Sequence, residues 1–279
     1  MWLFPLICMG MLGIAFGAGL AYASKKFAVE INPKIEALIN ILPGANCGAC
    51  GYPGCSGYAS AVASGEAEPD LCSPGGAEVV EKIAEILGVE VTTSEPETAF
   101  IKCAGAKDAV KDSYYAGVQS CALAALVNQG PNACKNACLM MGDCMDVCQF
   151  DAITWEPGQI PFIIEEKCTA CGKCMQICPK NIINLRPKSK RVLVLCSSQD
   201  KGAVARKACK VACIACTKCV KECPVDAIKI ENNHAIIDTK KCILCGKCVA
   251  VCPTNAIWDG RPLKKTVKKE KPVSETTQA

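Results

Sequence analysis

The chain has 279 residues, among them 25 Cys but only 3 Trp, 5 Tyr and 6 Phe, and its formal net charge is +4. Most of the thiols lie in tight runs, two or three residues apart. This is typical of metal ligation and not of a disulfide scaffold, and such thiolates need a reducing compartment. Thiolates bound to a metal centre carry negative charge that the formal count leaves out, so the lysine excess does not indicate a nucleic-acid partner, and none is expected.

Residues 1–24 carry no charge and are long enough to cross a bilayer as one helix. Lys25 and Lys26 follow at once, and by the positive-inside rule they direct the rest of the chain toward the cytoplasm. A cleaved signal peptide is the alternative, because Ala21-Tyr22-Ala23 has the form of a cleavage site, but the stretch lacks a basic start and is too long. We therefore expect residues 1–26 to be a retained single-pass anchor in the cell inner membrane, in contact with lipid, with the bulk of the chain on the cytoplasmic side.

Residues 27–89 have the form of a small iron–sulfur domain. An amphipathic helix is expected over 27–42 and another over 78–87, ended by Gly88, with the spacing C-x2-C-x4-C-x16-C between them. Small residues separate the thiols, so backbone N–H groups can approach the sulfurs, which favours a [4Fe–4S] cluster over zinc. The expected ligands are Cys47, Cys50, Cys55 and Cys72.

Beyond a stretch expected to be a linker or insert, 90–132, the chain repeats itself. Residues 133–153 align without a gap on 208–228 at a shift of 75, and Cys121 and Cys134 then fall on Cys196 and Cys209. A shift of 74 continues the match through the next cysteine run. Duplication of this kind predicts two ferredoxin-like domains, 133–185 and 208–260, with an insert at 186–207 between them and a disordered polar tail at 261–279.

The second copy contains two runs of the form C-x2-C-x2-C-x3-C-P. This is the pattern of bacterial two-cluster ferredoxins, in which three cysteines of a run hold one [4Fe–4S] cluster and the fourth binds the other. Zinc is the alternative, but zinc sites use two C-x2-C pairs. One cluster is expected on Cys213, Cys216, Cys219 and Cys252, and the other on Cys223, Cys242, Cys245 and Cys248.

The first copy differs at one informative position, where Met141 stands in place of Cys216. Its intact cluster is expected on Cys148, Cys168, Cys171 and Cys174. The altered cluster has Cys138, Cys144 and Cys178, and we expect Cys134, one helical turn before Cys138, to be its fourth ligand. The alternative is a three-iron [3Fe–4S] cluster without a fourth ligand.

Five clusters account for twenty cysteines, and four more thiols outside the anchor remain. These are Cys103, Cys121, Cys196 and Cys209. Four is the number that a sixth cluster needs, and the alternative is that they are buried thiols without iron. Apolar segments at 99–105 and 191–198 predict short strands that end near Cys103 and Cys196. His234, the single histidine, is expected in a hairpin and not as a ligand.

The fold class expected from these patterns is α+β: an N-terminal transmembrane helix, a small four-cysteine iron–sulfur domain, and two tandem 2[4Fe–4S] ferredoxin-like domains with inserts. The function expected is one-electron relay. Since no residue pattern for acid–base or nucleophilic chemistry is found, the chain is expected to act as a subunit and not as a standalone enzyme.

From its apolar N-terminus to about residue 260, the chain resembles the B subunits of Rnf complexes, the membrane-bound ferredoxin:NAD oxidoreductases of anaerobes. The resemblance depends on SKKFAVEINPKIEALINILPGANCGACGYPGC, residues 24–55, and on the ferredoxin-like repeats behind it. The doubled unit and Met141 match the longer forms of these proteins. The resemblance implies a complex that moves electrons from reduced ferredoxin to NAD and pumps Na⁺ or H⁺.

By the same resemblance, a soluble ferredoxin donates electrons to this subunit, and they pass to other Rnf-type membrane subunits, where FMN and NAD bind. The absence of a GxGxxG pattern and of a phosphate loop agrees with this. Two alternatives remain at this point. One is a membrane-tethered polyferredoxin of another anaerobic respiratory or hydrogenase complex. The other is a protein whose clusters are structural and hold an interaction surface, although a structural role needs one cluster and not five.

Overall fold

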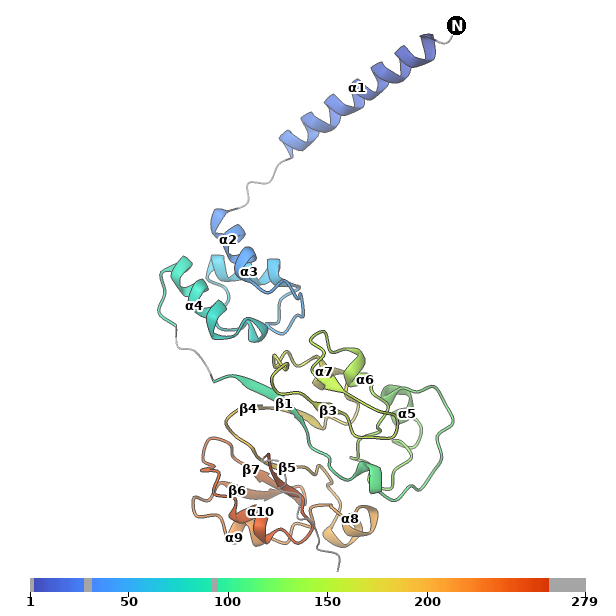
Figure 1. Ribbon diagram of the computed structural model, residues 1–279, viewed down its shortest axis with the longest axis vertical. Coiled ribbons are helices and arrows are strands. Elements are labelled where there is room, and N and C mark those ends of the chain that lie inside the picture. The colour runs from blue at the N-terminus through green and yellow to red at the C-terminus, as the bar shows by residue number, and fades with distance from the viewer. Residues whose placement is uncertain (1–2, 28–31, 92–94, 261–279) are drawn as a thin grey trace, which may run out of the picture.

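The computed structural model describes residues 3–27, 32–91 and 95–260. A long helix, α1 (Leu3–Lys26), projects from the rest of the chain, which comprises a small helical domain and a larger body of helices and short strands (Figure 1). The polar tail expected at 261–279 lies outside the described residues, as do residues 28–31 of the helix expected over 27–42.

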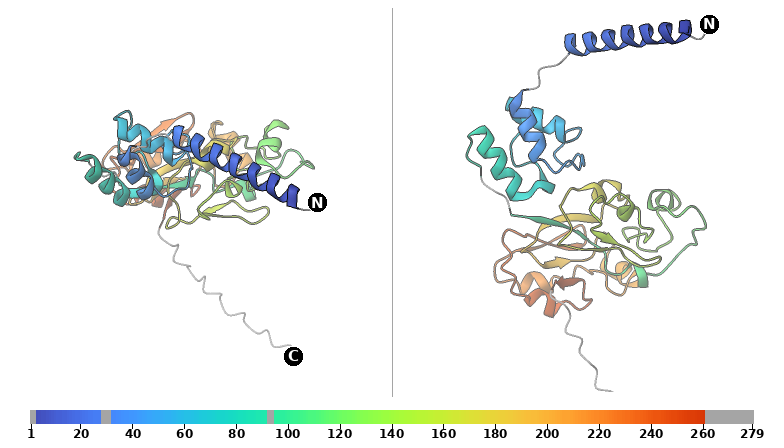
Figure 2. Two further views of the ribbon diagram at one scale, coloured as in Figure 1. Left: turned by 90° about the horizontal axis from the view of Figure 1, so that it is seen from above. Right: turned by 45° about the horizontal axis from the view of Figure 1, so that its top comes forward.

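The α1 helix is apolar on every side. It has 24 residues, which at 1.5 Å per residue gives a length of about 36 Å, enough for a hydrocarbon core of about 30 Å. Large side chains along it are exposed, for example Met9 (76%) and Ile14 (75%), and the right view of Figure 2 shows the helix standing apart from the other elements. By length and composition, residues 7–26 are able to cross a membrane.

The helical domain packs three helices around a small core. Its elements are α2 (Pro33–Ile41), α3 (Cys55–Ser64), the 3-10 turn η1 (Ser73–Gly75) and α4 (Gly76–Leu87). Asn32 caps α2 by accepting the N–H of Lys34 at 3.0 Å, and Gly88 ends α4 in a left-handed conformation (φ +70°), as expected. Leu38, Tyr58 and Ile83 form the core, one from each helix.

The first ferredoxin-like unit is closed by pairing of its first and last strands. β1 (Glu97–Ile101) lies antiparallel to β4 (Ile183–Pro187), and an inner pair joins β2 (Ile153–Thr154) to β3 (Phe162–Ile163). Its short helices are η2 (Ala106–Asp108), α5 (Cys121–Leu126), α6 (Asp143–Asp146) and α7 (Lys173–Ile177). The strand β1 lies within the stretch expected as a linker or insert, 90–132, and its pairing with β4 joins that stretch to the unit.

The second unit repeats this plan. β5 (Val192–Val194) pairs with β8 (Ile257–Asp259), and β6 (Ile228–Glu231) pairs with β7 (His234–Ile237). Its helices are α8 (Gly202–Ala208), α9 (Lys218–Lys221) and α10 (Lys247–Val251). The two strands expected before Cys103 and Cys196 are present as β1 and β5. His234 opens the second strand of a hairpin, with Nδ1 3.2 Å from the carbonyl oxygen of Asn232.

The repeat extends to individual backbone angles. In the run that begins at Cys213, the residues on either side of Cys216 are left-handed, namely Ala215 (φ +52°) and Thr217 (φ +61°). The two other intact runs place left-handed residues at the same positions: Ala170 and Gly172, Leu244 and Gly246. In the altered run Met140 (φ +56°) and Gly142 (φ +88°) do the same around Met141. The altered run therefore keeps the loop conformation of an intact one.

Candidate metal centres

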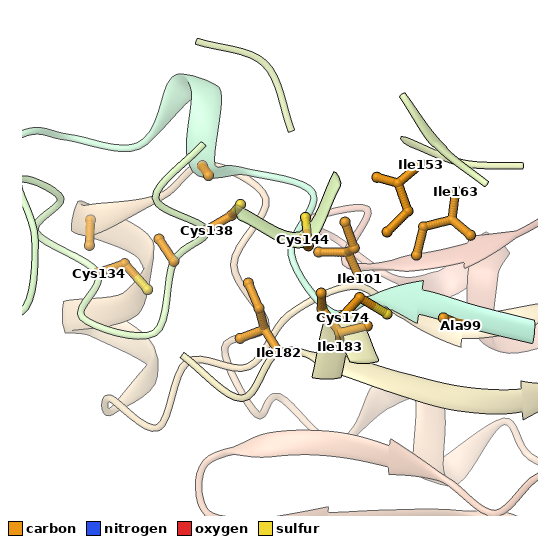
Figure 3. Packing of buried hydrophobic residues seen from close by; sticks show 13 residues of the cluster. Ala99, Ile101, Cys134, Cys138, Cys144, Ile153, Ile163, Cys174, Ile182 and Ile183 are labelled. Atoms are coloured by element: carbon orange, nitrogen blue, oxygen red, sulfur yellow. The ribbon is translucent and has the colours of Figure 1, made fainter. Parts of the chain in front are cut away.

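Cysteines make up much of the interior of both units. In the first unit Cys134, Cys138, Cys144 and Cys174 are buried together with alanine and isoleucine side chains of β1, β3 and β4 (Figure 3). The core of the second unit includes Cys196, Cys219 and Cys248 in the same way. With so few large apolar side chains, these cores depend on whatever the thiols bind.

In the helical domain, one group of four thiols lies at the start of α3 and on the loops beside it. We name it site A, and its members are Cys47, Cys50, Cys55 and Cys72. Burial, and to a lesser extent the charges of the three other thiols close to it, raise the pKa of Cys72 to about 11. The side-chain oxygen of Asn46 accepts the N–H of Cys55 at 2.8 Å and so fixes the loop that carries Cys47 and Cys50.

Three more groups follow the expected pattern of two-cluster ferredoxins. Site B consists of Cys148, Cys168, Cys171 and Cys174, whose charges act on one another. Site E consists of Cys213, Cys216, Cys219 and Cys252. Site F is a cavity lined by Cys223, Cys242, Cys245 and Cys248. The structure thus brings together each of these expected sets of four.

The altered run of the first unit has a different set of neighbours from the one expected. Its cavity, site C, is lined by Cys121, Cys138, Cys144 and Cys178, with Met141 beside them. Figure 3 shows Cys138 and Cys144 close together and Cys134 apart from them. The structure therefore brings Cys121, and not Cys134, to this group. Cys134 was expected as the fourth ligand because it stands one helical turn before Cys138. That argument requires residues 134–138 to be helical, and none of the described helices includes them.

Asp143 holds Cys121 at site C. Its carboxylate accepts the N–H of Cys121 at 2.8 Å, the N–H of Ala122 at 3.2 Å and the hydroxyl of Ser120 at 3.0 Å, which caps the start of α5. Burial alone would raise the pKa of Asp143, but these donors outweigh it and hold the pKa below its ordinary value. In the repeat alignment Asp143 replaces Lys218, so the exchanges at 141 and 143 occur together. Sequence reasoning did not use this signal.

A second cavity, site D, contains three of the four thiols that are not ligands of the five expected clusters, together with Cys134 in place of Cys121. It is lined by Cys103, Cys134, Cys196 and Cys209. Cys134 thus lies where Cys121 was expected, among the four thiols of a sixth group. The two cysteines trade places relative to the expectation from sequence.

The exchange has its origin in the repeat alignment. A shift of 75 lays Cys121 on Cys196, yet Cys121 begins α5 whereas Cys196 lies two residues after β5. The residue that corresponds to Cys196 in space is Cys103, two residues after β1. The longer connection of the first unit, which carries α5, separates Cys103 from Cys134, and so the equivalence cannot be read at a single shift.

The donor chemistry of these sites fits iron–sulfur clusters. Backbone N–H groups point at the sulfurs, for example Ala99 to Cys168 at 3.3 Å and Ala227 to Cys223 at 3.3 Å. Such bonds stabilise cluster-bound thiolates and tune their potentials. Burial raises the pKa of Cys138, Cys144 and Cys174 to about 12, so these thiols ionise only when a positive centre compensates the charge.

A single metal ion fits these donors less well. Within residues 3–27, 32–91 and 95–260, no three Cys, His, Asp or Glu side chains converge on one position that suits a single ion. Zinc draws its thiolates to about 2.3 Å from one point, whereas in a [4Fe–4S] cluster each thiolate binds a different iron.

Cysteines of different sites also lie close enough for their charges to interact. The charge of Cys47 raises the pKa of Cys171, so these two thiols connect site A with site B. The charge of Cys174 raises the pKa of Cys144, which connects site B with site C. In the second unit the charge of Cys219 raises the pKa of Cys248, which connects site E with site F.

Sites E and F reach the surface. Cys216 of site E and Cys245 of site F are exposed, the only exposed thiols in the described residues apart from Cys8 of α1. Five exposed lysines lie within a few residues of the thiols of these two sites: Lys218, Lys221, Lys240, Lys241 and Lys247. Exposed lysines thus lie two residues from each exposed thiol, Lys218 from Cys216 and Lys247 from Cys245.

Three family models match the chain. A model described as a putative Fe-S cluster matches residues 42–74, which contain site A. A 4Fe-4S binding domain matches residues 161–184 and a 4Fe-4S dicluster domain matches residues 212–257. The iron–sulfur character of the chain and its mixed α and β content agree with the expected fold class. Cys103, Cys121, Cys134, Cys196 and Cys209 lie outside all three matched ranges.

Whole-chain comparison finds similar proteins among the B subunits of ion-translocating complexes. The B subunit of the proton-translocating ferredoxin:NAD(+) oxidoreductase complex of Clostridium ljungdahlii is 46% identical over 84% of this chain and 83% of its own length. The B subunit of the Na(+)-translocating ferredoxin:NAD(+) oxidoreductase complex of Acetobacterium woodii is 43% identical over 86% of this chain and 72% of its own length. The B subunit of the ion-translocating oxidoreductase complex of Methanosarcina acetivorans is 41% identical over 82% of this chain and 88% of its own length.

Proposed function

This chain belongs to the family of B subunits of ion-translocating ferredoxin:NAD(+) oxidoreductase complexes, and we propose that it passes single electrons along its cysteine sites from the second ferredoxin-like unit to the membrane-anchored end. It is an electron-transfer subunit of such an oxidoreductase complex. The observation that carries the proposal is the succession of sites, in which the thiols of site A adjoin those of site B and the thiols of site B adjoin those of site C.

Five sites, A, B, C, E and F, hold one [4Fe–4S] cluster each. When bound, these clusters supply one-electron redox chemistry at potentials set by hydrogen bonds to sulfur and by exposure. Site C uses Cys121 as its fourth ligand, because Asp143 holds that thiol in the cavity beside Met141. With four thiolates, site C has a ligand for each iron of a [4Fe–4S] cluster, so the three-iron alternative is not adopted.

Electrons enter the chain at sites E and F. Their thiols Cys216 and Cys245 are exposed, so a soluble partner can approach them closely. The surrounding lysines suit a donor that carries negative charge, such as a reduced ferredoxin, and attraction of this kind raises the association rate. The chain thus offers ferredoxin two exposed thiols with a lysine beside each, Lys218 and Lys247.

Electrons leave at site A. This site belongs to the domain that directly follows α1, so anchoring of α1 in the membrane keeps site A near the membrane surface. The basic pair Lys25 and Lys26 at the end of α1 favours a cytoplasmic position for everything after it. Other membrane subunits of the complex are the acceptors.

The proposal is tested by anaerobic reduction of the full-length chain in detergent with catalytic amounts of ferredoxin and a ferredoxin-reducing system. Expected is bleaching of the cluster absorption, faster at low ionic strength. The control omits ferredoxin. If dithionite reduces the clusters but reduced ferredoxin does not, the clusters have a structural role and the proposal is overturned.

A further inference from the structure

The five sites proposed above fall into two runs. Sites A, B and C succeed one another through the helical domain and the first unit, and sites E and F lie in the second unit. Among the described residues, the cysteine contacts that lead from site C toward site E pass through the thiols of site D.

Site D lies where one segment from each unit runs antiparallel to the other. Two hydrogen bonds join the segments: Ala104 N to the carbonyl oxygen of Leu195 at 3.0 Å, and Ser197 Oγ to the carbonyl oxygen of Lys102 at 3.0 Å. These bonds flank Cys103 on one segment and Cys196 on the other. The two thiols therefore lie opposite each other at the junction of the units.

Each of these two thiols is hydrogen-bonded to the neighbouring site of its own unit. The backbone N–H of Cys138, a ligand of site C, points at the Sγ of Cys103 at 3.5 Å. The backbone N–H of Cys213, a ligand of site E, points at the Sγ of Cys196 at 3.2 Å. The same contact thus occurs twice, once in each unit, and it connects site D with site C and with site E.

The other two thiols of site D obey the same symmetry. Cys134 and Cys209 each stand four residues before the first cysteine of a run, Cys138 and Cys213 respectively. Burial raises the pKa of Cys134, and the charge of nearby Cys209 raises it further. Each unit therefore contributes one thiol after a strand and one thiol before a run.

The walls of site D are formed mostly by small residues. Besides the four thiols, small residues dominate its lining: Gly105, Ala106, Ala109, Ala137 and Ala212. A Cβ at position 105 would overlap the Sγ of Cys209, so the chain approaches that thiol as closely as a glycine permits. Site D is thus a group of four thiols among small neighbours, with Cys134 and Cys196 buried and Cys103 and Cys209 half-buried.

We propose that Cys103, Cys134, Cys196 and Cys209 hold a sixth [4Fe–4S] cluster, and that this site joins the two ferredoxin-like units into one electron path; the second part rests on the proposed function. The order of sites along the chain's path is then F, E, D, C, B and A. In this order site D connects the receiving unit with the unit next to the anchor.

The first test is the content of iron and acid-labile sulfide in the unaltered full-length chain, prepared without oxygen. About 24 iron with equal sulfide is expected for six clusters. About 20 would overturn the sixth cluster. This count needs no substitution, so a variant that fails to fold cannot obscure it.

The second test assigns the ligands. The double variant Cys103→Ala/Cys209→Ala is expected to lose about four iron, whereas Cys8→Ala, in α1, loses none. Adding Cys134→Ala to the double variant should remove no further iron, because its site is already empty. Adding Cys121→Ala should remove more, from site C. If adding Cys134→Ala removed further iron and adding Cys121→Ala did not, Cys134 would be a ligand of site C and the assignment would be overturned. An unchanged iron content in the double variant would also overturn it.

The third test concerns the path. In the Cys103→Ala/Cys209→Ala variant, reduced ferredoxin should reduce the clusters of sites E and F, about two of five, and leave A, B and C oxidised in electron paramagnetic resonance spectra. Reduction of all five at the unaltered rate would overturn the bridging role. A chain with about 24 iron that ferredoxin does not reduce at all would refute the proposed function and leave the sixth cluster standing.

Discussion

The carboxylate of Asp143 accepts the backbone N–H of Cys121 at 2.8 Å. Because this bond and its two companions fix the start of α5, Asp143→Ala should cost about 1 to 2 kcal/mol of local stability, as the loss of a cap does, and release Cys121 from site C. We expect a three-iron signal in electron paramagnetic resonance after brief exposure to air. Asp146→Ala, an exposed position in the same helix α6, is the matched control and should leave the spectrum unchanged.

Met141 has the backbone setting of a ligand without the thiol. Left-handed residues flank it as they flank Cys216, and it lines the same cavity as Cys121. Cys121→Ala should therefore lose iron from site C, between about one and four atoms, and Met141→Cys in the same chain should restore it. Iron and sulfide analysis of the single and double variants decides this. An unaltered iron content in Cys121→Ala would show that this thiol is not a ligand.

The lysines beside the exposed thiols of the second unit should govern how fast ferredoxin delivers electrons. Reversing the charges of Lys218 and Lys247, each beside an exposed thiol, is expected to slow reduction about ten-fold or more at low salt, with the difference vanishing at high salt. Stopped-flow absorption measures this. Lys34→Glu, on α2 of the helical domain, is the control; an equal slowing there would place the docking surface elsewhere.

Arg186 is a buried cation whose loss should weaken the first unit. Its side chain is 2% exposed, pairs with Glu165, and donates to the carbonyl oxygens of Pro187, Lys188 and Lys190 at 3.1 to 3.2 Å. Arg186→Met removes the donor from these half-buried acceptors, which should cost about 1 to 3 kcal/mol. Urea unfolding followed by loss of cluster absorption should show a lower midpoint.

The matched control for this substitution is Lys229→Met on β6, an exposed position of the second unit. Its midpoint should remain that of the unaltered chain. Equal midpoints for all three proteins would mean that Arg186 contributes nothing to the closure of β1 on β4.

Sequence reasoning reached the sites whose ligands are close in the chain. The spacing of Cys213, Cys216 and Cys219 is enough to predict their grouping, since a short loop can adopt only a few conformations around a cluster. The partner Cys252 followed from the ferredoxin pattern, and the structure places its charge beside Cys219. Family membership was also within reach, because residues 24–55 are so specific.

Sites C and D were beyond such reasoning, since their ligands come from segments that meet only in space. Cys121 reaches site C through a cap on α5, and Cys103 meets Cys196 across the junction of two units. Periodicity and spacing carry no information on either contact. The coincidence of Cys121 with Cys196 at a shift of 75 even suggested the wrong equivalence. The joint exchange at Met141 and Asp143 was the one local sign of the actual arrangement.

The symmetry of site D also bears on how the chain arose. One unit carries two of its four thiols, so a protein with a single unit would present half of the site on its surface. Two such molecules, paired about a two-fold axis, would complete it, because an isologous interface offers the same residues from both sides. Tandem duplication turns that encounter of two molecules into an intramolecular one, which no longer depends on protein concentration. The junction between the units is, in this sense, a homodimer interface kept within one polypeptide.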